Sequence, residues 1–104
     1  MPKVSLADAL ERLPAKFERP FDVIVEEPEF SIEIFAPRDI DRQTPHTRDE
    51  IYVVARGKSD FNEGGEMYAV VAGDVIVVAA GLEHRFENMS ADFATWVIFV
   101  GRES

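Results

Sequence analysis

The feature that most limits the fold of this chain is a succession of short apolar segments punctuated by glycine and polar turns. In a β-strand, successive side chains point to opposite faces, so a short alternating segment predicts a half-buried strand. Many short strands at close spacing are typical of an all-β sandwich or barrel. Eight such strands are predicted, over residues 21–27, 30–36, 50–56, 59–62, 66–72, 74–80, 84–88 and 94–100.

The segment before the first strand has a different period. After Ser5, the stretch "LADALERL" repeats its apolar residues at helical spacing, and Ser5 and Asp8 suit the start of a helix. Pro14 ends this pattern. We therefore predict one domain over residues 1–104, with a short N-terminal helix within 1–14 and a β-barrel over 21–101.

The composition of the chain excludes several classes of partner and compartment. The formal charge of −9 opposes binding to a phosphate backbone, so no nucleic-acid partner is expected. The chain has no cysteine, which leaves no disulfide framework. No apolar run has the length of a membrane span, and the first residues do not form a signal peptide. We expect a cytoplasmic protein without a membrane partner.

The loop "PRDIDRQTPHTRD" is the longest segment without periodicity, and long loops in small domains often carry function. It holds His46, and Glu50 follows at the start of the next strand. Four extended residues would separate their Cα atoms by about 13 Å, too far for two ligands of one metal ion. Pro45 and the β-branched run after Glu50 disfavour a helix. A shared site therefore requires a tight turn between His46 and Glu50.

The second histidine opens the strand "HRFEN". His84 and Phe86 share a face of this strand, and Arg85 lies on the other face. His84 is thus expected to point inward, where a buried imidazole needs a partner.

These residues fit two motifs of the cupin family, and the chain resembles a small cupin. The first motif, G-x5-H-x-H-x3-4-E-x6-G, matches at His46, Glu50 and Gly57. The second motif, G-x5-P-x-G-x2-H-x3-N, matches "GDVIVVAAGLEHRFEN", with alanine in place of proline and with His84 at the histidine position. The resemblance implies an all-β fold, the cupin double-stranded β-helix or jelly-roll barrel, preceded here by the short helix.

Cupins commonly bind a metal through three histidines and a glutamate. The resemblance therefore implies a divalent metal ion, Fe, Mn, Ni, Zn or Cu, held by His46, Glu50 and His84. The first histidine of H-x-H is replaced by Thr44, which leaves a position open for water or substrate, or marks a site that has lost its metal. Asp49 is a rival carboxylate, but its side chain is expected on the opposite strand face from Glu50.

Four further residues are predicted to line the pocket, namely Thr44, Tyr52, Phe86 and Trp96, although the three aromatic residues also suit a packed core. Arg48 and Arg85 could bind an acidic substrate, or they could be ordinary surface charges.

Two functions follow from the resemblance. One is a metal-dependent enzyme of dioxygenase, isomerase or decarboxylase type acting on a small polar metabolite. The other is a non-catalytic cupin, with or without metal, that binds or senses a small molecule. A homodimer is expected by analogy with the family.

Overall fold

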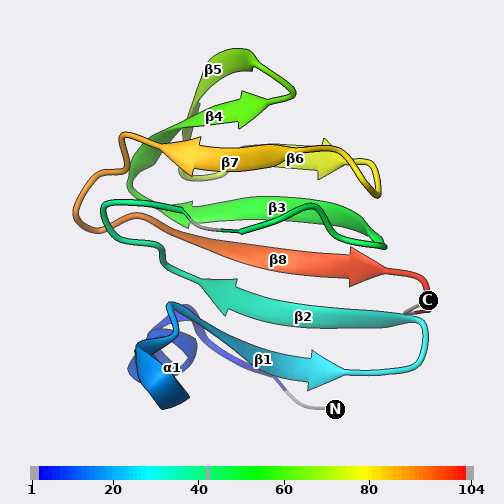
Figure 1. Ribbon diagram of the computed structural model, residues 1–104. Coiled ribbons are helices and arrows are strands. Elements are labelled where there is room, and N and C mark those ends of the chain that lie inside the picture. Colours follow the sequence, from blue (N-terminus) through cyan, green and yellow to red (C-terminus); the bar gives the residue numbers. More distant parts are fainter. Residues whose placement is uncertain (1–2, 42, 103–104) are drawn as a thin grey trace.

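A computed structural model describes residues 3–41 and 43–102, so residues 1–2 and 103–104 of the predicted domain lie outside the described part. One short helix precedes a set of antiparallel strands (Figure 1). The elements are α1 (Leu6–Glu11), the 3₁₀ turn η1 (Lys16–Glu18), β1 (Phe21–Glu26), β2 (Phe30–Phe35), β3 (Asp49–Arg56), β4 (Lys58–Glu63), β5 (Glu66–Val71), β6 (Val75–Val78), β7 (His84–Glu87) and β8 (Ala94–Val100). Every predicted strand is present, with ends that shift by one or two residues.

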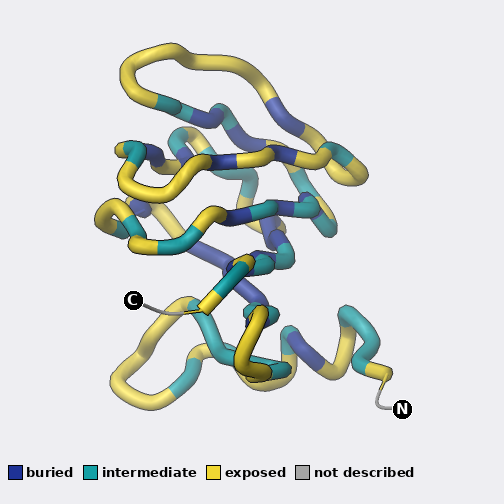
Figure 2. The backbone as a smooth tube through the Cα atoms, turned by 90° about the vertical axis from the view of Figure 1, so that its right-hand side faces the viewer, coloured by how far each residue is buried: buried dark blue, intermediate teal, exposed yellow. Residues whose placement is uncertain are grey.

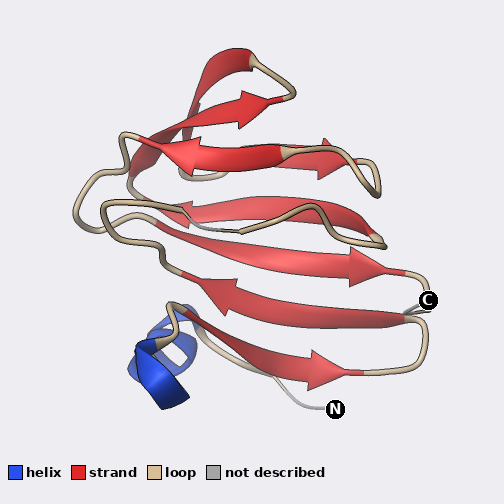
Figure 3. Cartoon of the chain, viewed as in Figure 1, coloured by secondary structure: helices blue, strands red, loops and turns tan. Residues whose placement is uncertain are grey.

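The strands form two sheets (Figure 3). The larger sheet has the order β1-β2-β8-β3-β6, and the smaller has the order β5-β4-β7. All pairings within them are antiparallel. The all-β fold predicted from the sequence is therefore confirmed, and its strands are arranged in two sheets.

Helix α1 begins where the sequence predicted. The Ser5 hydroxyl accepts a hydrogen bond from the Asp8 backbone N–H at 3.1 Å, which caps the first turn. The helix ends at Glu11, and Arg12 then pairs with Asp22 of β1 at 2.7 Å. Figure 1 shows α1 beside β1, at one end of the larger sheet.

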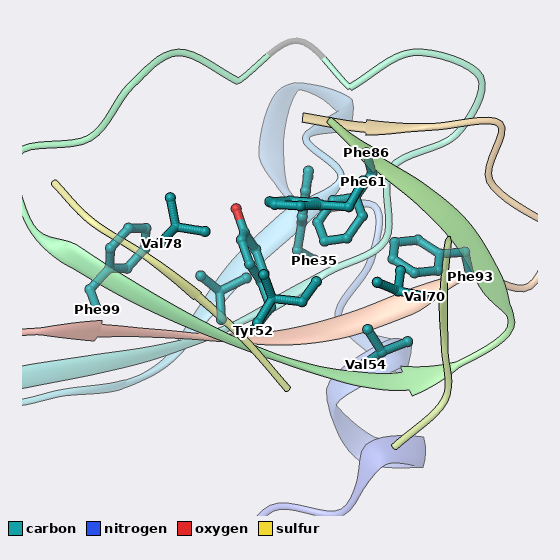
Figure 4. Packing of buried hydrophobic residues seen from close by; sticks show 11 residues of the cluster. Phe35, Tyr52, Val54, Phe61, Val70, Val78, Phe86, Phe93 and Phe99 are labelled. Atoms are coloured by element: carbon teal, nitrogen blue, oxygen red, sulfur yellow. The ribbon is translucent and has the colours of Figure 1, made fainter. Parts of the chain in front are cut away.

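An aromatic core fills the space between the two sheets (Figure 4). Tyr52 on β3 faces Phe86 on β7 with ring centroids 4.9 Å apart and nearly perpendicular planes. Phe61 on β4 and Phe93 also pack on Phe86, each at 4.9 Å. All four side chains are almost completely buried, and each contributes on the order of 1.5–3 kcal/mol through removal from water.

The strand register divides the larger sheet into two faces. On the inner face, Glu33, Val97, Tyr52 and Ile76 are successive cross-strand neighbours. On the outer face, the corresponding row is Ile34, Trp96, Val53 and Val75. Figure 2 shows the burial pattern along the backbone, with buried and exposed residues alternating within several strands.

Gly57, the last glycine of the first motif, occupies a site that only glycine fits. Its φ is +76°, a region that favours glycine, and it connects β3 to β4. A Cβ atom there would lie 2.8 Å from the Phe93 Cα and 2.5 Å from the Ser90 Oγ. The close passage of these two chain segments explains the requirement for glycine between the sheets.

Candidate metal centre

The two histidines and the glutamate converge on one point of the inner face. His46, Glu50 and His84 each place one ligand atom within 4.8 Å of the others. Nε2 of His84 lies 3.0 Å from Glu50 Oε1, and Nε2 of His46 lies 3.7 Å from the same oxygen. Glu50 and His84 are buried, whereas His46 is partly exposed.

The tight turn required between His46 and Glu50 is present. A bend at residues 47–48 separates His46 from the start of β3. The His46 carbonyl accepts a hydrogen bond from the Gly81 N–H at 2.8 Å, which ties the loop to the turn before β7. Asp49 projects elsewhere, and its Oδ1 accepts from the Ala80 N–H at 2.8 Å. Asp49 therefore supports the turn, and it is not in the group of side chains that converge.

The backbone sets the orientation of His84. Its Nδ1 lies 2.8 Å from the Leu82 carbonyl oxygen, which can only accept, so Nδ1 carries a proton. In the neutral ring, Nε2 then presents its lone pair to Glu50 and to the centre of the cluster. A carbonyl bonded to the far nitrogen of a histidine is the usual support of a metal ligand.

Glu50 provides the test of whether a cation suits the site. Its Oε1 faces the two imidazoles, but its Oε2 is buried without a hydrogen-bond partner in the described part of the chain. A buried carboxylate oxygen without a partner is costly. A divalent ion would satisfy this charge, and two imidazoles with one carboxylate are ligands that Fe, Mn, Ni, Zn and Cu accept. The residues present therefore fit a metal ion.

Thr44 is exposed, and its neighbour Gln43 reaches the cluster instead. The Gln43 Oε1 accepts a hydrogen bond from the Tyr52 hydroxyl at 3.1 Å and lies 3.4 Å from His46 Nε2. Gln43 is thus beside the position that the motif gives to a third histidine. The sequence analysis did not select it, and an amide one residue before the motif position was the only available signal.

Gln43 is itself held by a buried carboxylate. Asp41 Oδ2 accepts from the Gln43 side-chain amide at 2.6 Å and from the Phe86 N–H at 2.8 Å. The amide nitrogen is therefore oriented toward Asp41, and the amide oxygen toward Tyr52. Asp41 was also missed, because nothing in the loop sequence shows that it packs against β7.

Two groups of the cluster have raised pKa values. Burial and the nearby charge of Glu50 raise the pKa of the Tyr52 phenol far above its usual value, so Tyr52 stays protonated. Burial by itself would lower the pKa of His84, but the hydrogen bonds with Glu50 and with the Leu82 carbonyl outweigh it and raise that pKa. Without a cation, the raised pKa of His84 favours its protonated form, whose positive charge partly neutralises the site.

A pocket of about 240 Å³ opens onto the cluster. His46 and Glu50 lie in its wall, together with Gln43 from the loop. Glu33 on β2, together with Thr47 and Arg48 in the bend, completes its polar lining, and the apolar lining comprises Phe21, Phe35, Val97 and Phe99. A larger hollow of about 700 Å³ lies at the α1 end and shares Phe21, Phe35 and Gln43 with this pocket, but it is lined mainly by apolar residues and contains none of the three cluster residues.

Glu33 is a polar residue of the pocket that the sequence analysis did not select. Burial, reinforced by the charge of Glu50, raises the pKa of the Glu33 carboxyl to about 7. Glu33 alternates with apolar neighbours in β2, so its sequence pattern matched that of an ordinary solvent-facing glutamate. Its inward position results from the pairing of β2 with β8.

The predicted aromatic residues lie in different places. Tyr52 and Phe86 are fully buried in the core next to His84, and the Tyr52 hydroxyl is 3.0 Å from His84 Nε2. Trp96 lies on the outer face of β8, opposite Val53, so the structure does not bring it to the pocket. Arg85 pairs with Glu83 at 2.8 Å on the surface.

The fold and site together describe a small two-sheet β-protein with a candidate His₂Glu centre on its inner face. The cupin domain family matches residues 31–100, and the chain therefore belongs to the cupin family. An uncharacterised protein of Streptomyces coelicolor is 39% identical over 64 residues, which cover 62% of this chain and 61% of that protein. The match thus spans less than two thirds of that relative.

Solved structures agree on the fold. A cupin-2 domain protein from Shewanella frigidimarina superposes with a TM-score of 0.71 at 16% identity, covering 91% of each chain. KdgF from a Halomonas species superposes with a TM-score of 0.69 at 20% identity, covering 81% of this chain and 79% of that one. At such identities the likeness shows the shared fold. Over the described residues, no helix has the length and apolar character needed to cross a membrane.

Proposed function

We propose that this chain is a divalent-metal-dependent enzyme that acts on a small polar metabolite in the pocket beside β3. The observation that carries the proposal is the convergence of His46, Glu50 and His84 around a buried carboxylate oxygen without a partner. A metal ion bound there would supply Lewis acidity or a centre for reaction with O₂. Dioxygenase, isomerase and decarboxylase chemistry are all compatible with such a centre.

The chain's own residues would hold and shape this site. His84 is fixed by the Leu82 carbonyl, and Glu50 by its position at the start of β3. Tyr52 stays protonated and has two acceptors in reach, the Gln43 amide oxygen and His84 Nε2. With Nε2 of His84 committed to a metal ion, Tyr52 would keep its proton and donate its hydrogen bond to the Gln43 oxygen. Glu33 is the group in the pocket wall best suited to take or release a proton near neutral pH.

A second candidate is a metal-free cupin that binds or senses a small molecule. One observation favours it. His84 Nε2 lies 3.0 Å from both Glu50 Oε1 and the Tyr52 hydroxyl, so a protonated His84 makes a hydrogen-bonded cluster that needs no ion. In this case the pocket would still hold a ligand, but no chemistry would follow.

The experiment that tests the proposal combines metal analysis with turnover. Protein purified without an affinity tag, and its His46→Ala and His84→Ala variants, would be analysed for bound metals. We expect near-stoichiometric metal in the parent and clear loss in both variants. The Fe(II)-loaded parent would then be screened for O₂ consumption and for conversion of pooled metabolites.

The outcomes separate the two candidates. Metal in the parent together with turnover that disappears in His84→Ala supports the enzyme. Full metal retention in both histidine variants would refute the assigned centre. A protein that turns over nothing, but whose melting temperature rises with a metabolite, would favour the binding cupin.

A further inference from the structure

The pocket beside the candidate metal centre contains one guanidinium group without an acidic partner. Arg48 is partly buried and lines the pocket. Within the described ranges 3–41 and 43–102, it forms no ion pair with a carboxylate, whereas Arg12, Arg85 and Arg102 each do. Its one side-chain hydrogen bond is a long contact of 3.4 Å with the Ser31 hydroxyl. The charge of Arg48 acts on the Glu33 carboxyl of the same pocket, but no described carboxylate is in ion-pair contact with the guanidinium, which is therefore available to a ligand.

The Arg48 side chain is also held in place. Its Cζ lies 4.8 Å above the centre of the Phe99 ring, a cation–π contact. The Phe99 ring also packs against His46, whose ring centre lies 5.0 Å from that of Phe99. Arg48 Cζ and the His46 ring centre are therefore at most 9.8 Å apart, the sum of 4.8 and 5.0. One aromatic ring thus supports both the free guanidinium and a candidate metal ligand.

These contacts define the ligand. Because the guanidinium fork matches a carboxylate in shape and charge, a carboxylate is its natural partner. The chain has a formal charge of −9, so most of its surface repels anions. Arg48 provides a positive charge in the pocket, where an anion can therefore bind. We propose that the pocket binds a small carboxylate-bearing molecule, with its carboxylate on Arg48 and a second oxygen group directed at His46, Glu50 and His84.

The geometry limits the size of this molecule. The pocket of about 240 Å³ holds on the order of eight groups the size of water, at about 30 Å³ each. A chain of two to five carbons fits this volume, and Val97, Phe35 and Phe99 provide an apolar wall for it.

The charge of Glu33 favours a ligand with only one anionic group near Arg48. It lines the same pocket as Arg48, and its negative charge would oppose a second carboxylate. A Glu33→Gln substitution removes that charge and keeps a donor and an acceptor. The proposal therefore expects Glu33→Gln to bind a carboxylate at least as well as the parent.

The inference rests on the proposed metal centre for its second anchor, and the test separates the two. Glycolate, succinate and glutarate would be titrated calorimetrically into protein of measured metal content, with succinamide as the uncharged match of succinate. The variants are Arg48→Met, Glu33→Gln and, as a control that removes the same charge elsewhere, Arg85→Met. Arg85 is paired with Glu83 and does not line this pocket.

We expect at least one of the three acids to bind the parent, and Arg48→Met to weaken that binding roughly 10- to 100-fold at unchanged metal content. Arg85→Met should stay within twofold of the parent, and succinamide should bind far more weakly than succinate. The inference would be overturned if none of the acids bound, if Arg48→Met bound the acid as well as the parent, or if Glu33→Gln lost as much affinity as Arg48→Met. Loss of metal from the parent, with the Arg48 effect intact, would instead count against the proposed metal centre alone.

Discussion

The two faces of the larger sheet differ in where their polar residues lie. In most sheets the polar residues are on the solvent side, but here several of them are on the inner face. The inner face carries Glu33, Glu50 and Tyr52 among its apolar residues. The outer face is mainly apolar across β2, β3, β6 and β8, and its apolar members are Phe30, Ile32, Ile34, Ile51, Val53, Val75, Val77, Trp96, Ile98 and Val100. The polar groups are therefore on the side that faces the other sheet.

This difference shows which polar groups are structural and which are available for chemistry. Burying a carboxylate costs free energy unless a partner compensates it. Asp41 has such partners in Gln43 and the Phe86 N–H, but Glu50 Oε2 has none within the described residues. The inner face thus accepts a buried carboxylate oxygen without a partner at the point where the histidines converge. The predictions below test this contrast between the faces.

The largest effect is expected at the centre of the aromatic core. Phe86 is buried and packs on Tyr52, Phe61 and Phe93. Phe86→Ala should lower the free energy of unfolding by about 3–5 kcal/mol, measured by urea denaturation. A loss below about 1 kcal/mol would show that the two sheets do not pack through this cluster.

Two neighbouring valines on β6 compare the faces directly. Val78 is completely buried on the inner face, and Val77 is 66% exposed on the outer face. Val78→Ala should cost about 1–2 kcal/mol and Val77→Ala less than about 0.5 kcal/mol, because only the first leaves a cavity in the core. Equal losses in chemical denaturation of the dilute protein would contradict the assignment of the two faces.

The apolar outer face also supports the expected homodimer. Val75, Val77 and Val100 on it are 62%, 66% and 44% exposed, an apolar patch of the kind that marks protein–protein contacts. It measures about 20 Å by 20 Å from strand geometry, within a factor of two of the roughly 800 Å² that each partner contributes to a specific interface. We propose a second copy as the occupant, because two chains of formal charge −9 repel each other least across a patch of uncharged valine side chains.

Val77→Lys tests this arrangement by placing a charge on the patch. We expect sedimentation to show a dimer for the parent and a monomer for Val77→Lys, with metal content unchanged. The matched substitution Glu66→Lys, at an exposed position on β5, should leave the dimer intact. A monomeric parent would contradict the proposal, as would a Val77→Lys dimer of unchanged stability.

A smaller effect is expected from pH. The folded pKa of Glu33 is raised from 4.5 to about 7, mainly by burial, and the pKa of His84 is raised as well. A raised folded pKa favours the protonated form, so this stability is present at low pH and is lost as pH rises through the folded pKa. The melting temperature of the EDTA-treated protein should therefore fall between pH 5.5 and pH 8, and Glu33→Gln should reduce the slope. A melting temperature that rises over this range would show that Glu33 and His84 are not in these environments.

The strands and the His46–Glu50 turn were predictable because they depend on local rules. Alternation marks a strand, and the reach of two ligands of one ion forces a bend. The sequence alone was less informative about which face of each strand points toward the other sheet. Both faces of β8 are almost entirely apolar, so alternation does not tell on which face Trp96 lies, and the strand register puts it on the outer face beside Val53.

The remaining site residues depend on contacts between distant segments. Gln43 and Thr44 are adjacent in a loop without periodicity, so the motif selected the exposed one. Glu33 and Arg48 enter the same pocket only because β2 and the loop before β3 both lie against β8 and Phe99. No short sequence window contains that information.

The account depends most on Glu50 as the buried carboxylate that holds a metal ion. The direct measurement is the metal content per chain of tag-free parent, Glu50→Gln and Asp49→Asn, by elemental analysis after dialysis against a mixture of divalent metals. Asp49 is the adjacent carboxylate on the opposite strand face, and asparagine keeps the oxygen that accepts from Ala80. We predict close to one ion per chain in the parent and in Asp49→Asn, and a loss of at least tenfold in affinity in Glu50→Gln. Equal metal content in all three proteins, or none in the parent, would contradict the central claim.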